Sequence, residues 1–432
     1  MKKKLLTALK KAKKEVKNDK FRYLLLILLF SFFVFLRFYD LENKSTFTWD
    51  QVDNAWAAKT IIDDGRLPLV GMQVRGATGF YIGPLYYYFI TPFYYLTNLD
   101  PVAAGIIAGI TAIFSFIIFA VIIRKLFSFN TALVSLFFLT FSWNLISIDR
   151  VQWPVNLIPP ISLIIFFSPY KIIKGKEKYI ILLSIATGVM FHIHFTAVLF
   201  PILILFCLPF FPRNRETLKY SLISILIFIL FLVPSIANSI LSQGSTERSM
   251  LAYLNNFYHG FHLKRFMQIT GDALIEFNSI SYFGYLKYLS WLVYPLFASV
   301  LWIKNKKRER IIVLLGAIWI LVPWIVFSTY SGELTNYYFK MTMPIALMSI
   351  SYLVTKVFES KKIILIMPLA IFLFYYAFAG LSKFVTVNHQ GLKFYRERTM
   401  EKIDRGERIE FQMGVPDSYI YYIEVERKEN VK

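Results

Sequence analysis

The chain has 432 residues, of which 56% are hydrophobic, 18% are aromatic and only 17% are charged. Many apolar runs reach the ~17–25 residues that a bilayer-spanning helix needs, and they lack the alternation of barrel strands. This composition excludes a set of soluble domains and predicts an all-α polytopic membrane protein. The net charge of +21 is spread over short loops between apolar runs, which argues against a nucleic-acid partner. A single cysteine, Cys207, excludes an intramolecular disulfide.

The N-terminal segment, residues 1–22, is strongly basic, and we expect it in the cytoplasm. It is either an amphipathic helix on an anionic leaflet or a plain positive flank of the first span. That span covers about residues 23–38 and is expected to be a retained signal anchor, because no small-residue cleavage site follows it. Arg37 sits at its outer end, where its side chain can snorkel to the interface.

The first outer loop, residues 40–101, carries acids in otherwise apolar surroundings. If residues 51–64 form a helix, Asp50 is its N-cap, Asp53 lies one turn on, and Gly65 ends it. Capping would stabilise the ionised form of Asp50 and make it a weaker base. Two interpretations stay open for the pair of carboxylates: chemistry, or helix capping and dipole compensation alone.

A second helix of this loop is predicted over residues 83–97, which are apolar, rich in tyrosine and interrupted by Pro92. Tyrosine rings favour the membrane interface, so we expect this helix to lie in the outer interface and not to cross the bilayer.

Ten further spans follow the first, which gives about eleven transmembrane helices within residues 23–381. Every basic loop then falls on the same side as the N-terminus, as the positive-inside rule requires. Two long segments join the first loop outside: residues 241–285, an ordered loop that can cover a site, and the tail, residues 382–432, a small extracytoplasmic appendage. The ten spans are residues 102–123, 131–148, 155–169, 179–194, 195–211, 220–240, 286–303, 311–327, 339–356 and 363–381.

Two cations on the outer side are candidate phosphate ligands. Arg150 follows a span, and its planar guanidinium can bind a phosphate in a bidentate manner. Lys340 begins a span. The alternatives are a local pair with Asp149 or interfacial anchoring for Arg150, and simple snorkelling for Lys340.

His192 and His194 do not suggest a metal site, and the i, i+3 spacing of His259 and His262 permits one without indicating it. His192 and His194 are two residues apart, about 200° on a helix, so they cannot hold one metal from one face. The sequence also contains no Walker A, GxGxxG, CxxC or HExxH motif.

Two stretches resemble known sequence motifs. Trp49-Asp50-Gln51 after the first span, followed by a predicted helix and then by Gly-Pro-Leu-Tyr-Tyr-Tyr at residues 83–88, resembles the membrane glycosyltransferases of the C type. The similar branch is the bacterial and archaeal set related to protein O-mannosyltransferases and aminoarabinose transferases. There, an Asp-Glu pair follows the first helix, so Gln51 departs from the pattern, as does the absence of a lysine before Gly83.

Three later elements are similar to the same branch. Arg150 followed by residues 153–159 is similar to its pattern of Arg and then Trp-Asn-Pro-Asn-Leu-Leu-Pro, with Pro-Val in place of Asn-Pro. His194-Phe-Thr-Ala looks like its His-x-Thr-Ala element, and Tyr337-Tyr338 loosely resembles its late His-Tyr element.

The resemblance implies an enzyme that moves a sugar from a polyprenyl-phosphate donor to a lipid, glycan or protein acceptor. Transfer would take place on the outer face of the plasma membrane, with inversion and without a cofactor or a metal. It implies that Asp50 is the base or orients the acceptor, and that Arg150 and Lys340 contact the donor phosphate. The side chains implied to contact the sugar, or the groups that hold it, are Gln51, Asp53, Tyr81, Asn156, His194 and Tyr338.

Two other functions remain open from the sequence. A transporter or flippase of lipid-linked sugars would also carry charges along a substrate path, although no internal repeat is visible and many transporters are built from repeats. A scaffold protein would need no special explanation for its polar outer loop.

Overall fold

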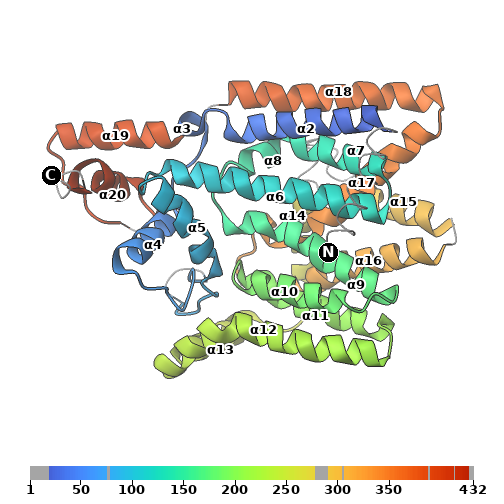
Figure 1. The fold of residues 1–432 in the computed structure, drawn as a ribbon, viewed down its shortest axis with the longest axis horizontal. Helices are drawn as coiled ribbons and strands as arrows, with labels where there is room; N and C mark the ends of the chain where they lie inside the picture. Colours follow the sequence, from blue (N-terminus) through green and yellow to red (C-terminus); the bar gives the residue numbers. More distant parts are fainter. Residues whose placement is uncertain are drawn as a thin grey trace, which may run out of the picture.

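The computed structural model describes residues 19–74, 78–277, 290–303, 306–387, 390–412 and 414–427, and these are almost entirely helical (Figure 1). They contain no β-strand, only two isolated bridges, Gln73–Tyr81 and Tyr258–Tyr330. The predicted all-α class is therefore confirmed, while most of the basic segment 1–22 lies outside the described residues. The α-helices are α2 (Lys20–Phe38), α3 (Leu41–Lys44), α4 (Asp50–Asp64), α5 (Leu85–Leu96), α6 (Val102–Leu126), α7 (Phe129–Phe141), α8 (Trp143–Ile148), α9 (Ile158–Ile173), α10 (Tyr179–Phe191), α11 (Leu199–Cys207), α12 (Arg215–Leu241), α13 (Ser245–Phe257), α14 (Leu263–Phe277), α15 (Ser290–Ile303), α16 (Lys307–Phe327), α17 (Met343–Glu359), α18 (Ile363–Thr386), α19 (Leu392–Asp404) and α20 (Pro416–Tyr421).

Among the described residues, seven helical segments are long and apolar enough to cross a membrane. A polytopic membrane protein is therefore confirmed. Four shorter apolar helices overlap the other four predicted spans, so the count of about eleven stays a prediction, as does the orientation. The seven segments are Lys20–Phe38, Val102–Leu126, Pro154–Ile173, Arg215–Leu241, Lys307–Phe327, Tyr337–Glu359 and Ile363–Thr386; the four shorter ones are Phe129–Phe141, Tyr179–Phe191, Phe195–Phe210 and Leu292–Ile303.

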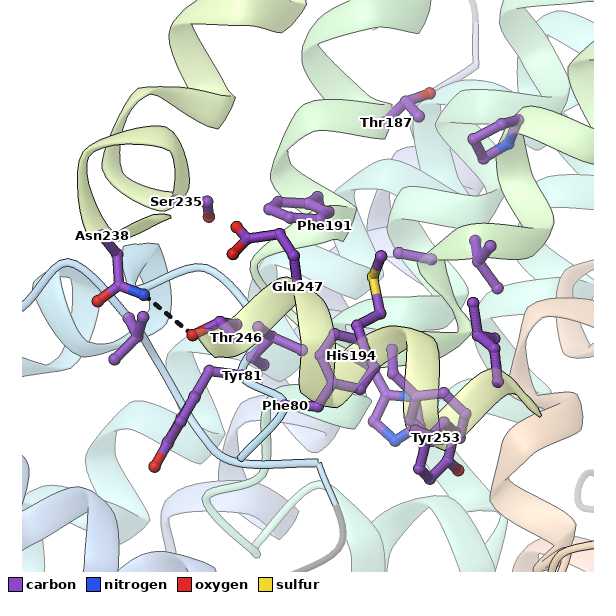
Figure 2. Close-up of a pocket in the computed structure, with 18 of the residues that line it drawn as sticks. Phe80, Tyr81, Thr187, Phe191, His194, Ser235, Asn238, Thr246, Glu247 and Tyr253 are labelled. Carbon is purple, nitrogen blue, oxygen red and sulfur yellow. Dashed lines mark hydrogen bonds between the residues drawn. The ribbon is translucent and has the colours of Figure 1, made fainter. Parts of the chain in front are cut away.

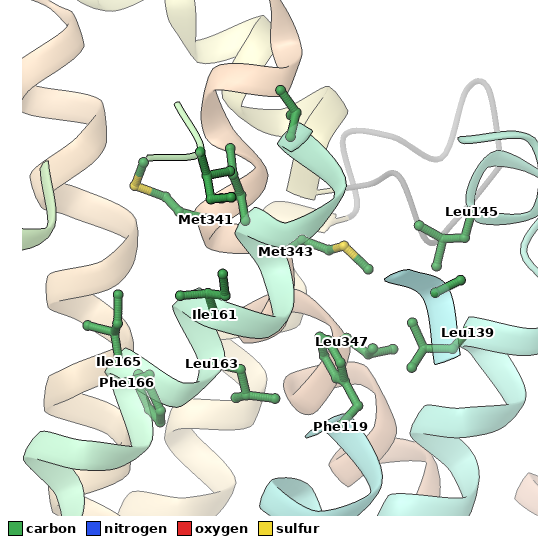
Figure 3. Packing of buried hydrophobic residues seen from close by; sticks show 14 of the residues in the cluster. Phe119, Leu139, Leu145, Ile161, Leu163, Ile165, Phe166, Met341, Met343 and Leu347 are labelled. Atoms are coloured by element: carbon green, nitrogen blue, oxygen red, sulfur yellow. The ribbon is translucent and has the colours of Figure 1, made fainter. Parts of the chain in front are cut away.

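Burial sorts these helices into a centre and two edges. The apolar windows of Pro154–Ile173 and Tyr337–Glu359 are each 72% buried, whereas those of α12 and α18 are 6% and 11% buried. Helices α12 and α18 accordingly lie at opposite edges of the bundle in Figure 1. The central helices pack through large apolar side chains from α6, α7, α9 and α17, among them Phe119, Leu139, Leu163, Phe166 and Leu347 (Figure 3).

The predicted span over residues 131–148 is not one continuous helix, because the helix breaks at Ser142 between α7 and α8. Arg37 supplies a reason. Its guanidinium donates to Leu139 O at 2.7 Å and to Thr140 O at 2.9 Å, carbonyls that a helix end leaves without an intrahelical partner. The expectation that Arg37 snorkels is wrong: it is 0% exposed and its Nη2 lies 2.8 Å from Asp149 Oδ2.

The polar segments gather at one end of the bundle (left in Figure 1). Helices α3, α4 and α5 of the first loop lie there, and the tail returns to them: α19 packs on α3, and α20 packs on α4. Helix α5 has only 12 residues and contains Pro92, which agrees with a helix too short to span; its place in the interface stays a prediction. The described part of the predicted loop 241–285, residues 241–277, is largely helical, because it contains α13 and α14.

Candidate active site

Helix α4 places Asp50 differently from the predicted cap. The helix begins at Asp50, and its N-cap is Trp49, which has φ 45° and ψ −115° and makes no side-chain capping bond. Capping by Asp50 is therefore wrong. The Trp49 backbone is held from outside the helix, since its N–H donates to Gly414 O at 2.7 Å. The predicted end of the helix is confirmed: Gly65 has φ 63°, and its N–H bonds to Ile61 O at 3.0 Å.

The environment of Asp50 favours its protonated form. Burial raises the pKa of Asp50 above its usual value, and the charge of Asp53 raises it further, while a hydrogen bond from Trp153 lowers it. This reverses the weaker base expected from capping, because a carboxylate with a raised pKa takes up a proton more readily. Burial likewise raises the pKa of Asp53. The Gly414 N–H, which donates to Asp53 Oδ1 at 3.0 Å, lowers that pKa but by less.

Gln51, at the position where the resembling branch carries Glu, is buried and joins two segments. Its amide nitrogen donates to Gln152 O at 3.0 Å, and its amide oxygen accepts from the Thr48 N–H at 3.2 Å. It thereby fixes α4 against the segment that supplies Trp153.

Asp50 lines a cavity of about 240 Å³. Its walls bring together residues that are far apart in the sequence: Trp153, His194, Tyr337 and Tyr338. Three predicted site residues, Asp50, His194 and Tyr338, therefore meet at one cavity. Sequence reasoning missed Trp153 and Tyr337 as site residues, although both lie in the motifs that carried the resemblance.

A second cavity of about 300 Å³ adjoins the first, because Ile82, His194 and Phe195 line both. Its walls are mostly apolar, with a polar group at one side formed by Asn238, Thr246 and Glu247 (Figure 2). Tyr81 and His194 also line this second cavity. Its walls come from α10 to α13 and from the loop before α5, so the helix within the predicted loop 241–285 does cover a cavity.

Lys340 and Asn156 lie behind Trp153. Lys340 Nζ is 4.7 Å from the centre of a Trp153 ring and donates to Asn156 Oδ1 at 3.1 Å. The Asn156 amide nitrogen is in turn anchored on Ile148 O and Val151 O, at 2.9 and 3.0 Å. Lys340 is 5% exposed and does not line the cavity of Asp50. The charge of Lys340 nevertheless acts on the imidazole of His194, and His194 does line that cavity.

The Arg150 side chain binds backbone carbonyls away from the cavity of Asp50. Its guanidinium is 3% exposed and donates to four backbone carbonyls at and just beyond the end of α2, and Asp149 pairs with Arg37 instead. The expected pair of Arg150 with Asp149 is therefore wrong, whereas its contact with a phosphate stays a prediction, which the proposed site does not use. The accepting carbonyls are those of Leu36, Tyr39, Asp40 and Lys44, at 2.9, 2.7, 3.2 and 3.2 Å.

The two histidines have separate surroundings. His192 Nε2 lies 2.9 Å from Phe231 O, and Gly83 packs directly on the ring, since a Cβ there would stand 1.9 Å from His192 Nδ1. His194 Nδ1 lies 3.0 Å from Thr196 Oγ1. Within the described ranges, no three His, Cys, Asp or Glu side chains are grouped as a metal site would require; activity without a metal stays a prediction.

Residues 82–238 match the family model of dolichyl-phosphate-mannose-protein mannosyltransferases. The match covers just over a third of the chain, and over these residues the chain is similar to this family of glycosyltransferases that use lipid-phosphate sugars. The prediction of an enzyme that transfers a lipid-linked sugar is thereby confirmed. A search of curated proteins finds no match.

Solved structures with the same fold accompany this family match. ArnT from Cupriavidus metallidurans bound to undecaprenyl phosphate has a TM-score of 0.60 at 12% identity, over 92% of this chain and 74% of that one. The Archaeoglobus fulgidus oligosaccharyltransferase tethered with an acceptor peptide has a TM-score of 0.58 at 12% identity, over 92% of this chain and 60% of that one. At such identities, the likeness is one of fold.

Proposed function

We propose that this glycosyltransferase moves a sugar from a polyprenyl phosphate to an acceptor hydroxyl on the outer face of the plasma membrane, with inversion. The observation that carries the proposal is the position of Asp50, a carboxylate with a raised pKa in the wall of a cavity that adjoins a larger apolar one. The acceptor is a lipid, glycan or protein, and no nucleic acid takes part.

In the proposed reaction, the acceptor oxygen attacks the anomeric carbon in a single displacement. The carbon–oxygen bond to the phosphate breaks, and the electron pair leaves with the polyprenyl phosphate. The acceptor proton passes to the Asp50 carboxylate. The donor is already activated, so the protein has to position the reactants, stabilise the leaving phosphate and accept one proton.

The two cavities suggest where the reactants bind. The apolar cavity, lined by Phe80, Phe191 and Phe195, would take the first isoprenoid units of the donor. The sugar would lie in the cavity of Asp50, with Tyr338 and His194 in its walls. Lys340, which acts electrostatically on His194, would stabilise the developing charge of the phosphate. Tyr81, Gln51, Asp53 and Asn156 would hold this arrangement.

Two solved relatives support this donor class by what they contain. The ArnT structure has bound undecaprenyl phosphate, and the AglB structure from Archaeoglobus fulgidus has bound dolichol-phosphate, at a TM-score of 0.54 and 10% identity over 92% of this chain. Both ligands are polyprenyl phosphates, the class that we assign to the donor here.

The test is transfer by purified enzyme from a radiolabelled polyprenyl-phosphate sugar. Asp50→Asn should lower kcat by about 10²–10⁴-fold, the usual contribution of a general base. Asp64→Asn, at the exposed end of the same helix, is the matched control and should transfer normally. Normal transfer by Asp50→Asn would remove the base assignment. Passage of labelled lipid across proteoliposomes without a glycosidic product would instead indicate a transporter.

A further inference from the structure

The tail of the chain is firmly attached to the first outer loop. The Tyr419 hydroxyl donates to Leu99 O at 2.9 Å, and Arg396 binds Glu42 at 3.0 Å and Asp100 at 2.6 Å. Charged hydrogen bonds of this kind are stronger than neutral ones. The tail is therefore held against the loop that carries Asp50.

Within the tail, Gly414 binds the first turn of α4 at two points. Its carbonyl accepts from the Trp49 N–H at 2.7 Å, and its own N–H donates to Asp53 Oδ1 at 3.0 Å. Trp49 is the N-cap of α4, and Asp53 lies one turn further on. Asp50 therefore lies between the two residues that Gly414 holds.

The contact requires glycine at this position. Gly414 has φ 72°, and a Cβ there would stand 2.9 Å from Trp49 Cε3 and 3.1 Å from Trp49 Cα. Trp49 itself is 72% exposed and has a φ of 45°, which is uncommon for a non-glycine residue. Its conformation is thus held by the bond to Gly414 and not by burial of its ring.

We propose that Gly414 is a positioning residue for sugar transfer. Its two backbone hydrogen bonds, to Trp49 and to Asp53, form what we call the clip, and the clip fixes the Asp50 carboxylate at the cavity. This inference rests on the proposed role of Asp50. It assigns to the tail, some 360 residues away in the sequence, a part in the reaction. The clip acts on the orientation of the base and leaves binding of the donor lipid to the other cavity.

Gly414→Ala tests the clip, and Gly406→Ala is its matched control. Gly406 lies in the same tail and has φ 71°, but nothing lies within 4 Å of its Cβ position. Alanine thus meets the same unfavourable backbone at both sites and a clash only at Gly414. We expect kcat to fall about tenfold in Gly414→Ala with the donor KM within about twofold of the parent. Gly406→Ala should keep the parental kcat.

Hydrogen exchange measured by mass spectrometry gives a readout that is independent of activity. The Trp49 N–H should exchange faster in Gly414→Ala and at the parental rate in Gly406→Ala, because only the former loses the bond to Gly414 O. Equal exchange and equal kcat in the two alanine variants would overturn the proposal.

Two substitutions of Asp53 keep the proposal testable if Gly414→Ala does not fold. Asp53→Asn retains an oxygen that accepts from the Gly414 N–H, whereas Asp53→Ala does not. We expect kcat, measured above the pKa of Asp50, to be about tenfold higher in Asp53→Asn than in Asp53→Ala. Equal losses would assign Asp53 a role that depends on its charge and would overturn the clip.

The same assay separates this proposal from the one on which it rests. If Asp50→Asn abolishes transfer while Gly414→Ala matches Gly406→Ala, the clip is wrong and the function stands. If Asp50→Asn transfers normally, the proposed base is wrong, whereas hydrogen exchange at Trp49 still reports whether Gly414 holds α4.

Discussion

Trp153 and Asp50 line the same cavity, and the interaction of the indole with the carboxylate lowers the pKa of Asp50. The same indole lies 4.7 Å from the ammonium of Lys340. One aromatic side chain thus contacts Lys340 and also acts on the carboxylate of the candidate base.

The effect of Trp153 on Asp50 should be visible in the pH dependence of transfer. This interaction lowers the pKa of Asp50, so Trp153→Phe should raise that pKa, and the acid limb of the kcat profile should move to higher pH. The loss of the interaction should also lower kcat by about three- to tenfold at its optimum. Trp302→Phe, at an exposed position, is the control. An unshifted acid limb in Trp153→Phe would contradict the interaction.

Asp50 should reduce the stability of the fold at neutral pH. Its folded pKa is raised by burial and by Asp53, so protonation stabilises the folded state, and this stabilisation is lost as pH rises through the folded pKa. Asp50→Asn resembles the protonated acid and should raise the Tm by about 1–3 °C at pH 7. Near pH 3, where Asp50 is itself protonated, the difference should vanish. A Tm gain at pH 7 that persists unchanged at pH 3 would point to another cause.

The pair of Arg37 and Asp149 should be essential for folding. The arginine is 0% exposed and also binds Leu139 O and Thr140 O, so removing either partner leaves a buried charge without its counterpart. Arg37→Met and Asp149→Asn should each cost about 3–5 kcal/mol of unfolding free energy. Combining them should cost less than the sum, which chemical denaturation in detergent can measure. Strict additivity would show that the two side chains do not interact.

Arg150 has two competing interpretations. Its sequence motif suggests a phosphate ligand, whereas its contacts suggest a structural residue. It donates to four carbonyls around the end of α2, so Arg150→Met should lower the unfolding free energy by about 2–3 kcal/mol. The enzyme that remains folded should bind the donor with a KM within about twofold of the parent. A donor KM raised tenfold or more, at unchanged stability, would restore the phosphate contact.

Several local features were predictable from neighbouring residues. Helix α4 and its end at Gly65 follow from helical spacing and a glycine that tolerates positive φ. The short helix after Gly83 follows from its length and from Pro92. These signals are local, so the sequence carries them without knowledge of the packing.

The partners of the charged side chains were not predictable in this way. Arg150 follows Asp149 directly in the sequence, and Arg37 was expected at the interface. In the structure, Arg37 pairs with Asp149, 112 residues away, and Arg150 donates to carbonyls at the end of α2. Likewise, the capping expected of Asp50 failed because Gly414, over 360 positions away, holds the backbone of Trp49. A long flexible side chain takes the partner that the packing brings near, and sequence spacing does not encode that partner.

By itself, the sequence determined the class of this protein. The apolar runs make it a polytopic helical membrane protein, and the order of its motifs from Asp50 to Tyr338 indicated a lipid-linked-sugar glycosyltransferase, because composition and short motifs are properties of contiguous residues. Only the tertiary structure decided the environment of Asp50. Its raised pKa, the cavity that it shares with Trp153 and the return of the tail to α4 depend on burial and on contacts between distant segments. These exist only once the chain has folded.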